Sequence, residues 1–381
     1  MFHYTVVMPC LNEERTLAGC IREAQIGAEA SGKQVEIIVA DNGSSDKSVE
    51  IAQELNCRVI NVNVKGYGAA LDAGIRAASS NFVVMGDSDL SYNFTEAPRF
   101  LAELEKGFDV VIGNRFAGGI ETGAMPWHHR YIGNPILSRI GRLFFRIPIS
   151  DFHCGLRAVR VSKYLQAAPT TTGMEFATEM IARFANVGAN FTEIPIKLRK
   201  DGRNRKPHLR TFPDGWRHLK MMLLFSPQYF LLYPGITLLI LGTYGLLSFA
   251  LTGTIDLLIA KSNVQASIFS LVSFMLGLQL MTASFISMAV AKAKLVTLFK
   301  PWESLEKVLT SKLFLSSSIA LSLVGVFWLA SIGSIWLQND FPSVNPLSES
   351  RKTIPLVGLV IAGGQGILCS IQVRQVLSKF W

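Results

Sequence analysis

The chain has 381 residues, a formal net charge of +9 and 49% hydrophobic residues, but only 17% charged residues, against about 25% in an ordinary soluble protein. This balance excludes disordered, collagen-like and coiled-coil chains, and it favours a membrane protein with room for two or three structural units. The five cysteines lie far apart without a C-x-x-C pair, which disfavours a disulfide framework and a zinc cluster.

The N-terminal half alternates short β-branched runs with segments of helical period, which predicts a βαβ series. The expected strands are Tyr4–Met8, Val35–Ala40, Arg58–Val62, Phe82–Met85 and Asp109–Ile112. Because these apolar runs are nearly continuous, we expect a parallel, Rossmann-like α/β sheet covered on both faces, with ligands beyond the carboxyl ends of the strands. No basic and apolar leader precedes the first run, so we expect no cleavable signal peptide and a cytosolic N-terminus.

Polar turns follow the first three expected strands. They are Pro9–Glu14, Asp41–Asp46 and Lys65–Ala70. The first two are also compatible with ordinary helix caps and first-turn carboxylates. The third places glycines and a lysine near a helix start, which suits the close approach of an anion. It lacks the final glycine of a G-x-G-x-x-G pattern, which disfavours a dinucleotide site.

Two carboxylates one residue apart, Asp87 and Asp89, follow the fourth expected strand. Such oxygen ligands suit Mg²⁺ or Mn²⁺, which binds one or two carboxylates together with substrate phosphates. The alternative is that both side chains merely solvate a turn. Their place at the end of a βαβ strand favours the metal. A cation that bridges a diphosphate has a clear task in sugar transfer, because it neutralises the leaving nucleoside diphosphate.

Residues 136–147 form an amphipathic pattern of helical period. The apolar face contains Ile136, Ile140, Leu143, Phe144 and Ile147, and the basic face contains Arg139, Arg142 and Arg146. One interpretation is a helix that lies in the headgroup region of a membrane and docks the catalytic domain there. The alternative is a packed core helix with a basic solvent face.

A dense basic segment precedes the first long apolar stretch. Its nine cations in 24 residues are Lys197, Arg199, Lys200, Arg203, Arg205, Lys206, Arg210, Arg217 and Lys220. The positive flank of a membrane helix explains part of this cluster. The number exceeds what anchoring needs, so attraction of a lipid phosphate is the second interpretation. Nucleic acid is disfavoured as a partner because the cluster adjoins a membrane span.

The remaining part, residues 221–381, contains four apolar stretches without charge. They are residues 228–251, 264–291, 313–337 and 354–373. Each reaches the ~20 residues that a helix needs to cross about 30 Å of hydrocarbon, which predicts a four-helix transmembrane domain. The loop between the second and third stretches carries five lysines, and the other two loops carry one and two cations. By the positive-inside rule, we expect the five-lysine loop, residues 1–220 and the C-terminus on the cytosolic side of the cell (inner) membrane.

The ordered motifs of the first 220 residues resemble family 2 glycosyltransferases, and within them the dolichyl-phosphate mannosyltransferase-like (polyprenyl-phosphate glycosyltransferase) branch. The motifs that carry the resemblance are Val7-Met8-Pro9 with Asn12-Glu13-Glu14, Val39–Asp46, Lys65-Gly66-Tyr67-Gly68, Asp87-Ser88-Asp89-Leu90, Ile112-Gly113-Asn114-Arg115, and Asp151 with Cys154-Gly155-Leu156-Arg157. The Q-x-x-R-W pattern of processive polysaccharide synthases is absent. Chain polymerisation is therefore disfavoured.

The resemblance implies a GT-A fold, inversion at the anomeric carbon and a set of site residues. The implied nucleotide-binding residues are Pro9, Leu11, Asn12, Glu13, Val39, Asp41, Gly66, Asp87, Ser88 and Asp89. The implied metal site is Asp87, Asp89 and Ser91, and the implied catalytic residues are Asp87, Asp89 and Glu179, the last near the sugar. Arg115, Arg130, Arg199 and Arg205 are implied to bind phosphates of acceptor and donor. Relatives often carry glutamine in place of Ser91 and lysine in place of Arg205.

The function expected is transfer of a hexose from a nucleotide sugar, of the UDP-glucose or GDP-mannose class, to dolichyl or undecaprenyl phosphate at the cytosolic membrane face. The acceptor phosphate is ionised at neutral pH, so positioning and charge neutralisation rather than a strong base would supply most of the catalysis. The sequence leaves open the base, the sugar, the polyprenyl chain and the choice between Mg²⁺ and Mn²⁺.

Two alternatives remain open at this point. One is a glycosyltransferase that acts on another membrane lipid. The other is a scaffold or flippase with a degenerate nucleotide-binding domain, although the apolar stretches lack the internal charges that transport pathways usually need. Small residues in the last stretch, such as Gly363 and Gly364, suit close helix packing and leave a homo-oligomer interface open.

Overall fold

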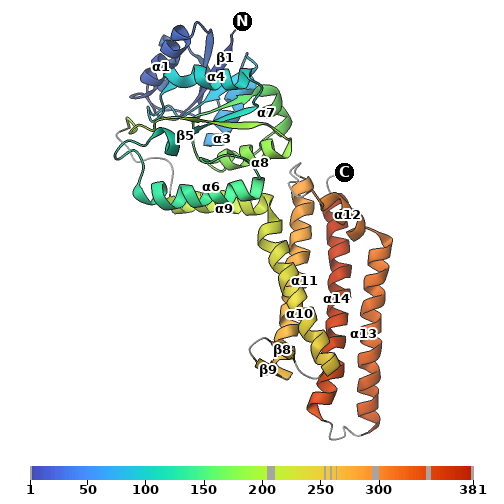
Figure 1. Cartoon of the computed structure of the whole chain (residues 1–381). Coiled ribbons are helices and arrows are strands. Elements are labelled where there is room, and N and C mark those ends of the chain that lie inside the picture. The colour runs from blue at the N-terminus through green and yellow to red at the C-terminus, as the bar shows by residue number, and fades with distance from the viewer. Residues whose placement is uncertain are drawn as a thin grey trace. The chain divides into compact units, whose positions relative to one another are not determined.

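The computed structural model describes residues 2–203, 211–252, 255–257, 260–262, 264–293, 300–339 and 345–378. The chain divides into two compact units, Met1–Met222 and Leu223–Trp381 (Figure 1).

The N-terminal unit contains a seven-stranded sheet. Its strands are β1 (Tyr4–Cys10), β2 (Val35–Asp41), β3 (Arg58–Asn61), β4 (Phe82–Met85), β5 (Val110–Asn114), β6 (Arg157–Arg160) and β7 (Phe191–Pro195). Their order across the sheet is β3-β2-β1-β4-β6-β5-β7. The strand order proceeds from β1 through β2 and β3 on one side and continues with β4 on the other, so the carboxyl ends of the parallel strands β1 and β4 form the switch point where ligands bind in such sheets.

The sheet is mixed, so the expectation of an all-parallel sheet was wrong at β6. This strand runs antiparallel to both β4 and β5, with Ile112 paired to Arg157 and Val110 to Val159. The amide of Gly113 donates to the carbonyl of Leu156 (3.0 Å), which places the start of β6 beside the end of β5. Because β6 starts at the carboxyl ends of the neighbouring strands, it must run antiparallel to them. The composition of β6 alone does not show at which end of these strands it starts.

The helices of the N-terminal unit alternate with these strands, and several of them cover the sheet. They are α1 (Leu17–Ala30), α2 (Ser48–Glu54), α3 (Tyr67–Ala77), η1 (Phe94–Glu96), α4 (Ala97–Glu105), α5 (Arg115–Gly118), η2 (His129–Gly133), α6 (Asn134–Phe145), α7 (Val161–Ala167), α8 (Phe176–Asn186) and α9 (Thr211–Phe225). Val6, Val7, Ile38 and Val39 of the central strands are completely buried. Each such side chain contributes about 1.5–3 kcal/mol to folding, which explains why the apolar runs identify these strands correctly.

The C-terminal unit is helical. Its elements are η3 (Gln228–Leu232), α10 (Tyr233–Thr252), β8 (Ile255–Leu257), β9 (Ala260–Ser262), α11 (Val264–Ala293), α12 (Trp302–Leu309), α13 (Lys312–Gln338) and α14 (Pro346–Ser378). Among the described residues, four helices are long and apolar enough to span a membrane, which agrees with the four transmembrane helices predicted for this part of the chain. The last helix begins at Pro346 rather than near residue 354, because the helix continues through Pro355.

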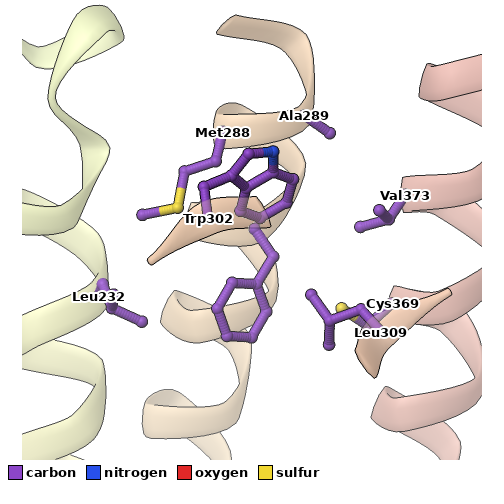
Figure 2. Close-up of a cluster of buried hydrophobic side chains, with 8 residues drawn as sticks. Leu232, Met288, Ala289, Trp302, Leu309, Cys369 and Val373 are labelled. Atoms are coloured by element: carbon purple, nitrogen blue, oxygen red, sulfur yellow. The ribbon is translucent and has the colours of Figure 1, made fainter. Parts of the chain in front are cut away.

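The short helix α12 packs against the long helices through Trp302. Figure 2 shows this completely buried indole among Met288 and Ala289 of α11 and Val373 of α14. The end of α12 is held by Arg374, whose guanidinium donates to the carbonyl of Thr310 (2.7 Å). The loop between the second and third spans therefore includes a docked helix, which hydropathy alone does not show.

Glycines of the C-terminal unit permit close helix packing within the chain. A β-carbon on Gly363 would lie 2.5 Å from the backbone nitrogen of Ser322, and one on Gly325 would lie 2.7 Å from Val360. These two glycines bring α13 and α14 together. Gly364 has open space beside it. The homo-oligomer expected from the small residues therefore stays a prediction, because the described contact of Gly363 is internal.

Candidate active site

The turns after β1 and β2 are joined by hydrogen bonds. The backbone N–H of Asn12 donates to the hydroxyl of Ser44 (2.9 Å), and the side-chain oxygen of Asn12 accepts from the amide of Ser45 (2.7 Å). Asn12 has a left-handed backbone with φ 58°, a conformation that asparagine tolerates better than most residues. The carboxylate of Asp41 accepts from the amides of Gly43 (3.0 Å) and Ser44 (3.1 Å). The two turns thus form one rigid edge.

The predicted nucleotide residues differ in how much surface they offer. Pro9 lies within β1 and Leu11 is half-buried just beyond it. Val39 is completely buried within β2, so it lies beneath the edge and presents no surface to a ligand. Glu13 is 5% exposed, and its amide donates to the hydroxyl of Ser48 (2.8 Å).

Asn42 attaches the third turn to the first two, a role that the sequence did not reveal. Its side-chain amide donates to the carbonyl of Val64 (2.8 Å), and its side-chain oxygen accepts from the amide of Gly66 (2.7 Å). Gly66 has φ +135°, and a β-carbon there would lie 2.1 Å from the carbonyl oxygen of Thr172. Only glycine allows this approach. The start of α3 therefore contacts the segment that precedes α8.

The acidic turn after β4 lies beside the end of β1. The hydroxyl of Ser88 donates to the carbonyl of Pro9 (2.7 Å), which fixes the turn at the switch point. One oxygen of Asp89 accepts from the amide of Ser91 (3.0 Å) and from its hydroxyl. Asp89 and Ser91 are buried, and Asp87 is half-buried. The structure therefore brings Asp87 and Asp89 together with the turns that follow β1, β2 and β3.

Burial, together with the charge of Asp89, raises the pKa of Asp87 to about 6. Arg203 and the hydroxyl of Tyr67 oppose this shift. Two crowded carboxylates of this kind are stabilised by a cation, and their oxygen atoms are the ligands that Mg²⁺ and Mn²⁺ prefer. The donor set of this turn fits such an ion.

Arg203 reaches this acidic turn. Its Nη1 lies 3.0 Å from Oδ2 of Asp89, and its Nη2 lies 2.7 Å from Oε1 of Glu13. In the sequence Arg203 is one of nine cations, and no local signal distinguishes it from the others. Arg205, which the resemblance implied as a phosphate ligand, lies outside the described residues.

Arg199 is held beside the same turn by its backbone. Its N–H donates to the carbonyl of Ser91 (2.9 Å), and its guanidinium forms hydrogen bonds of 2.8 and 2.9 Å with the carboxylate of Glu23 on α1. Arg130 lies on η2, and its guanidinium carbon is 5.5 Å from the ring centre of Tyr131. Phosphate binding by these two arginines stays a prediction.

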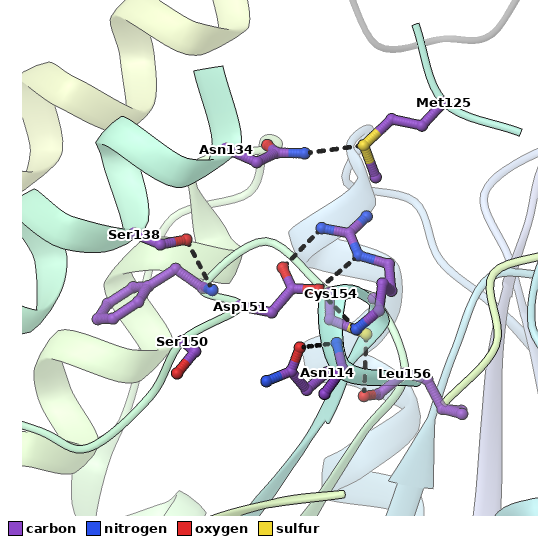
Figure 3. Close-up of polar contacts among 12 residues, drawn as sticks. Asn114, Met125, Asn134, Ser138, Ser150, Asp151, Cys154 and Leu156 are labelled. Carbon is purple, nitrogen blue, oxygen red and sulfur yellow. Dashed lines mark hydrogen bonds and ion pairs between the residues drawn. The ribbon is translucent and has the colours of Figure 1, made fainter. Parts of the chain in front are cut away.

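Arg115 and Glu179 are buried and bound by protein partners. The guanidinium of Arg115 pairs with Asp151, which Figure 3 shows beside Asn114 and Ser138. The carboxylate of Glu179 accepts from the amides of Thr170 (3.0 Å) and Thr171 (2.7 Å) and pairs with Arg183 (2.7 Å). Burial alone would raise the pKa of Glu179, but the hydrogen bonds from Thr171 and Thr170 outweigh it and lower the pKa. In this structure Glu179 orders the segment that contacts Gly66.

Comparison with known proteins assigns both parts of the chain. Residues 5–166 match the model of glycosyl transferase family 2, and residues 292–376 match the glycosyltransferase family 2 C-terminal transmembrane region. The low-salt glycan biosynthesis hexosyltransferase Agl6 of Haloferax volcanii is 36% identical over 243 residues, or 64% of this chain and 58% of that protein.

Two further relatives are named for lipid-linked sugar transfer. The dolichyl-phosphate hexose transferase of Haloferax volcanii is 33% identical over 195 residues, which cover 51% of this chain and 82% of that protein. The undecaprenyl-phosphate 4-deoxy-4-formamido-L-arabinose transferase of Salmonella paratyphi B is 30% identical over 202 residues, which cover 50% of this chain and 58% of that protein. The chain thus spans somewhat more than half the length of two of these three relatives. The chain belongs to glycosyl transferase family 2, as a GT-A domain followed by a transmembrane region.

Proposed function

We propose that this enzyme transfers a hexose from a nucleotide sugar to a polyprenyl phosphate, with inversion at the anomeric carbon. The observation that carries the proposal is the acidic turn of Asp87 and Asp89, which lies at the switch point of the sheet beside the joined turns of β1, β2 and β3. The names of the relatives support a polyprenyl phosphate acceptor. The four apolar helices support an acceptor that resides in a membrane.

On the donor side, the protein would fix the nucleoside along the edge formed by Asn12 and Asp41. Asp87 and Asp89 would hold Mg²⁺ or Mn²⁺, which supplies neutralisation of the charge that develops on the leaving diphosphate. Gly66 allows the backbone at the start of α3 to come close to this region, where an N-terminal helix end favours an anion. The class of the sugar, UDP-glucose or GDP-mannose, belongs to the proposal.

On the acceptor side, a phosphate oxygen would attack the anomeric carbon as the bond to the diphosphate breaks. This oxygen is already ionised at neutral pH, so the protein need not supply a strong base. Arg130 and Arg199 would align the acceptor phosphate, and most of the rate enhancement would come from this positioning. Arg115 would contribute only if it left Asp151, whereas Glu179 would act by holding the segment next to Gly66.

The surface of α6 supports docking of the catalytic unit on a membrane. Ile136 is 49% exposed and Leu143 is 59% exposed, while the buried side of the helix carries Ser138, Gly141 and Phe145. Much of the apolar face is therefore accessible, which favours membrane docking over a packed core helix with a basic solvent face. The helix ends at Phe145, so the prediction that Ile147 belongs to this face was wrong.

Exposed aromatic side chains occur in the segments next to α6 in sequence and on α9. Trp127 and Tyr131 are 66% and 67% exposed, and Trp216 is 61% exposed. Tryptophan and tyrosine favour the headgroup region, and arginine binds anionic lipid there. We propose that this surface lies on the cytosolic leaflet of the cell (inner) membrane, so that the acceptor phosphate reaches the acidic turn.

A transfer assay tests the proposed function. The full-length chain in lipid nanodiscs is incubated with Mn²⁺ or Mg²⁺, undecaprenyl or dolichyl phosphate, and radiolabelled UDP-glucose or GDP-mannose. We expect label in the organic extract from one donor, loss of that label when the cation is chelated, and loss in Asp89→Asn. Glu54→Gln, which removes an exposed carboxylate on α2, is the matched control and should keep full turnover. Label that persists in Asp89→Asn would contradict the assigned site, and absence of label with every donor would contradict the reaction.

A further inference from the structure

Arg203 forms the densest ion-pair cluster of the candidate site. Its Nε donates to Oε1 of Glu13 (2.8 Å), its Nη2 lies 2.7 Å from the same carboxylate, and its Nη1 lies 3.0 Å from Asp89. The side chains of Arg203, Glu13 and Asp89 are only 15%, 4% and 9% exposed. An ion pair this sheltered is weakly screened by solvent. The contact therefore affects whatever else binds Asp89.

The backbone holds Arg203 in this position. The amide of Gly202 donates to the carbonyl of Asp89 (2.8 Å), and the amide of Arg199 donates to the carbonyl of Ser91 (2.9 Å). A β-carbon on Gly202 would lie 2.9 Å from the methyl group of Thr16, so the segment approaches the start of α1 closely. Two backbone hydrogen bonds thus fix the segment of residues 199–203 along the acidic turn. The guanidinium is directed at Asp89 by the fold rather than by the reach of a long side chain.

Both oxygen atoms of Asp89 already have partners, so a metal cation can bind there beside Arg203 only after a rearrangement. One oxygen of Asp89 is bonded to Ser91, and the other faces Arg203. A divalent ion that binds Asp89 must therefore compete with the guanidinium. An arriving diphosphate changes this balance, because its oxygen atoms offer the planar guanidinium new acceptors with the geometry that arginine prefers.

We propose that Arg203 is the resident counter-cation of the acidic turn and a positioning residue that couples metal binding to diphosphate binding. This inference rests on the proposed function. The metal alone binds weakly because it must displace Arg203 from Asp89. The diphosphate accepts hydrogen bonds from the displaced guanidinium of Arg203, and this lets the metal bind. By thermodynamic reciprocity, each ligand raises the affinity for the other by the same factor.

The experiment measures Mn²⁺ binding rather than turnover. Full-length protein in detergent is titrated with MnCl₂, with the free ion followed by electron paramagnetic resonance, first alone and then with saturating UDP or GDP. Arg203→Met removes the charge and keeps much of the length of the side chain. Loss of one charge-assisted hydrogen bond to a carboxylate should tighten binding of Mn²⁺ alone by about tenfold. The factor by which the nucleotide tightens Mn²⁺ binding should fall by about the same amount.

Two further variants complete the test. Arg160→Met removes an arginine that pairs with Asp109 (3.2 Å) at the amino end of β4, at the opposite end of the strands from the acidic turn. This variant should bind Mn²⁺ like the unchanged protein. Arg203→Lys keeps the charge and loses the two-point contact, so its Mn²⁺ affinity should change in the same direction as that of Arg203→Met, by a smaller factor. If Arg203→Met does not fold, the direction in which Arg203→Lys changes the Mn²⁺ affinity tests the inference instead.

The outcomes separate this inference from the proposed function. If the unchanged protein binds Mn²⁺ and nucleotide but neither Arg203 variant alters the Mn²⁺ affinity or the coupling factor, the inference is wrong and the proposed function stands. If the unchanged protein binds neither Mn²⁺ nor UDP nor GDP, the proposed function fails and the inference fails with it.

Discussion

Arg115 and Asp151 form a two-point ion pair inside the N-terminal unit. Nε and Nη2 of the guanidinium each lie 2.7 Å from an oxygen of the carboxylate, and the backbone N–H of Arg115 donates to the same group (3.0 Å). Asp151 is completely buried and Arg115 is 7% exposed. The pair joins the end of β5 to the segment before β6, which fixes the edge of the sheet where the acidic turn lies.

Removing one partner of this pair should destabilise the N-terminal unit strongly. Arg115→Met or Asp151→Asn leaves a buried charge without its partner, and we expect a loss of about 3–5 kcal/mol in the free energy of unfolding. Hydrogen exchange of the β5 and β6 amides measures this loss without interference from the membrane helices. Arg76→Met removes an exposed pair with Asp72 and should cost at most about 1 kcal/mol. Equal effects of all three variants would contradict a structural role for Arg115.

Gly66→Ala should separate α3 from the segment before α8. The added β-carbon would meet the carbonyl oxygen of Thr172 at 2.1 Å, and it would also strain a backbone with φ +135°. We expect lower stability and at least about tenfold weaker binding of UDP or GDP, measured by calorimetry, because a shift of this backbone disturbs the anion site at the helix start. Gly107→Ala has similar strain at φ +107° but open space around it. Its nucleotide affinity should stay unchanged, and a parallel loss there would assign the effect to strain alone.

Acidification should destabilise the N-terminal unit through two buried histidines. The rings of His153 and His218 lie 4.8 Å apart, and Nδ1 of His218 is 2.8 Å from the hydroxyl of Thr178. Burial, with a further effect of Arg157, lowers the pKa of His218 to about 4, and burial lowers the pKa of His153 well below its usual value. The unfolded chain takes up protons below about pH 6.5, while the folded chain does so only at lower pH.

The stabilisation by neutral His218 is therefore complete above about pH 6.5 and is lost as the pH falls toward 4. The loss amounts to on the order of 3 kcal/mol at pH 4. Thermal unfolding followed at several pH values between 7 and 4 should show this decline. His218→Gln keeps a polar partner for Thr178 and should flatten the profile. A profile of the same slope in this variant would exclude His218 as its source.

The exposed apolar face of α6 should determine access of the lipid acceptor. The double variant Ile136→Glu with Leu143→Glu places charges where the proposal puts lipid headgroups, so we expect the KM for undecaprenyl or dolichyl phosphate in nanodiscs to rise by about tenfold. The KM for the nucleotide sugar should not change. Leu165→Glu alters a leucine on α7 that is 48% exposed and serves as the control. A shift of the donor KM instead would indicate that α6 supports the fold rather than the membrane contact.

The sequence alone predicted the features that depend on residues close together in the chain, namely the membrane helices, most strands and the turns after them. The four apolar stretches predicted the membrane helices, because crossing hydrocarbon requires only length and the absence of charge. The apolar runs predicted five of the seven strands of the sheet. The turns that follow them predicted that Asp41, Asp87 and Asp89 lie at one edge, because parallel strands place their carboxyl ends together.

The tertiary structure decided which side chains pair across that edge. Arg203 and Glu13 are 190 residues apart in the chain, and only the path of the segment at residues 199–203 selects this arginine from nine nearby cations. The path of the chain between β5 and β6 gives β6 its antiparallel direction and brings Asp151 to Arg115. These features depend on contacts between segments that are distant in the sequence. Such contacts result from packing of the whole sheet and its helices rather than from local composition.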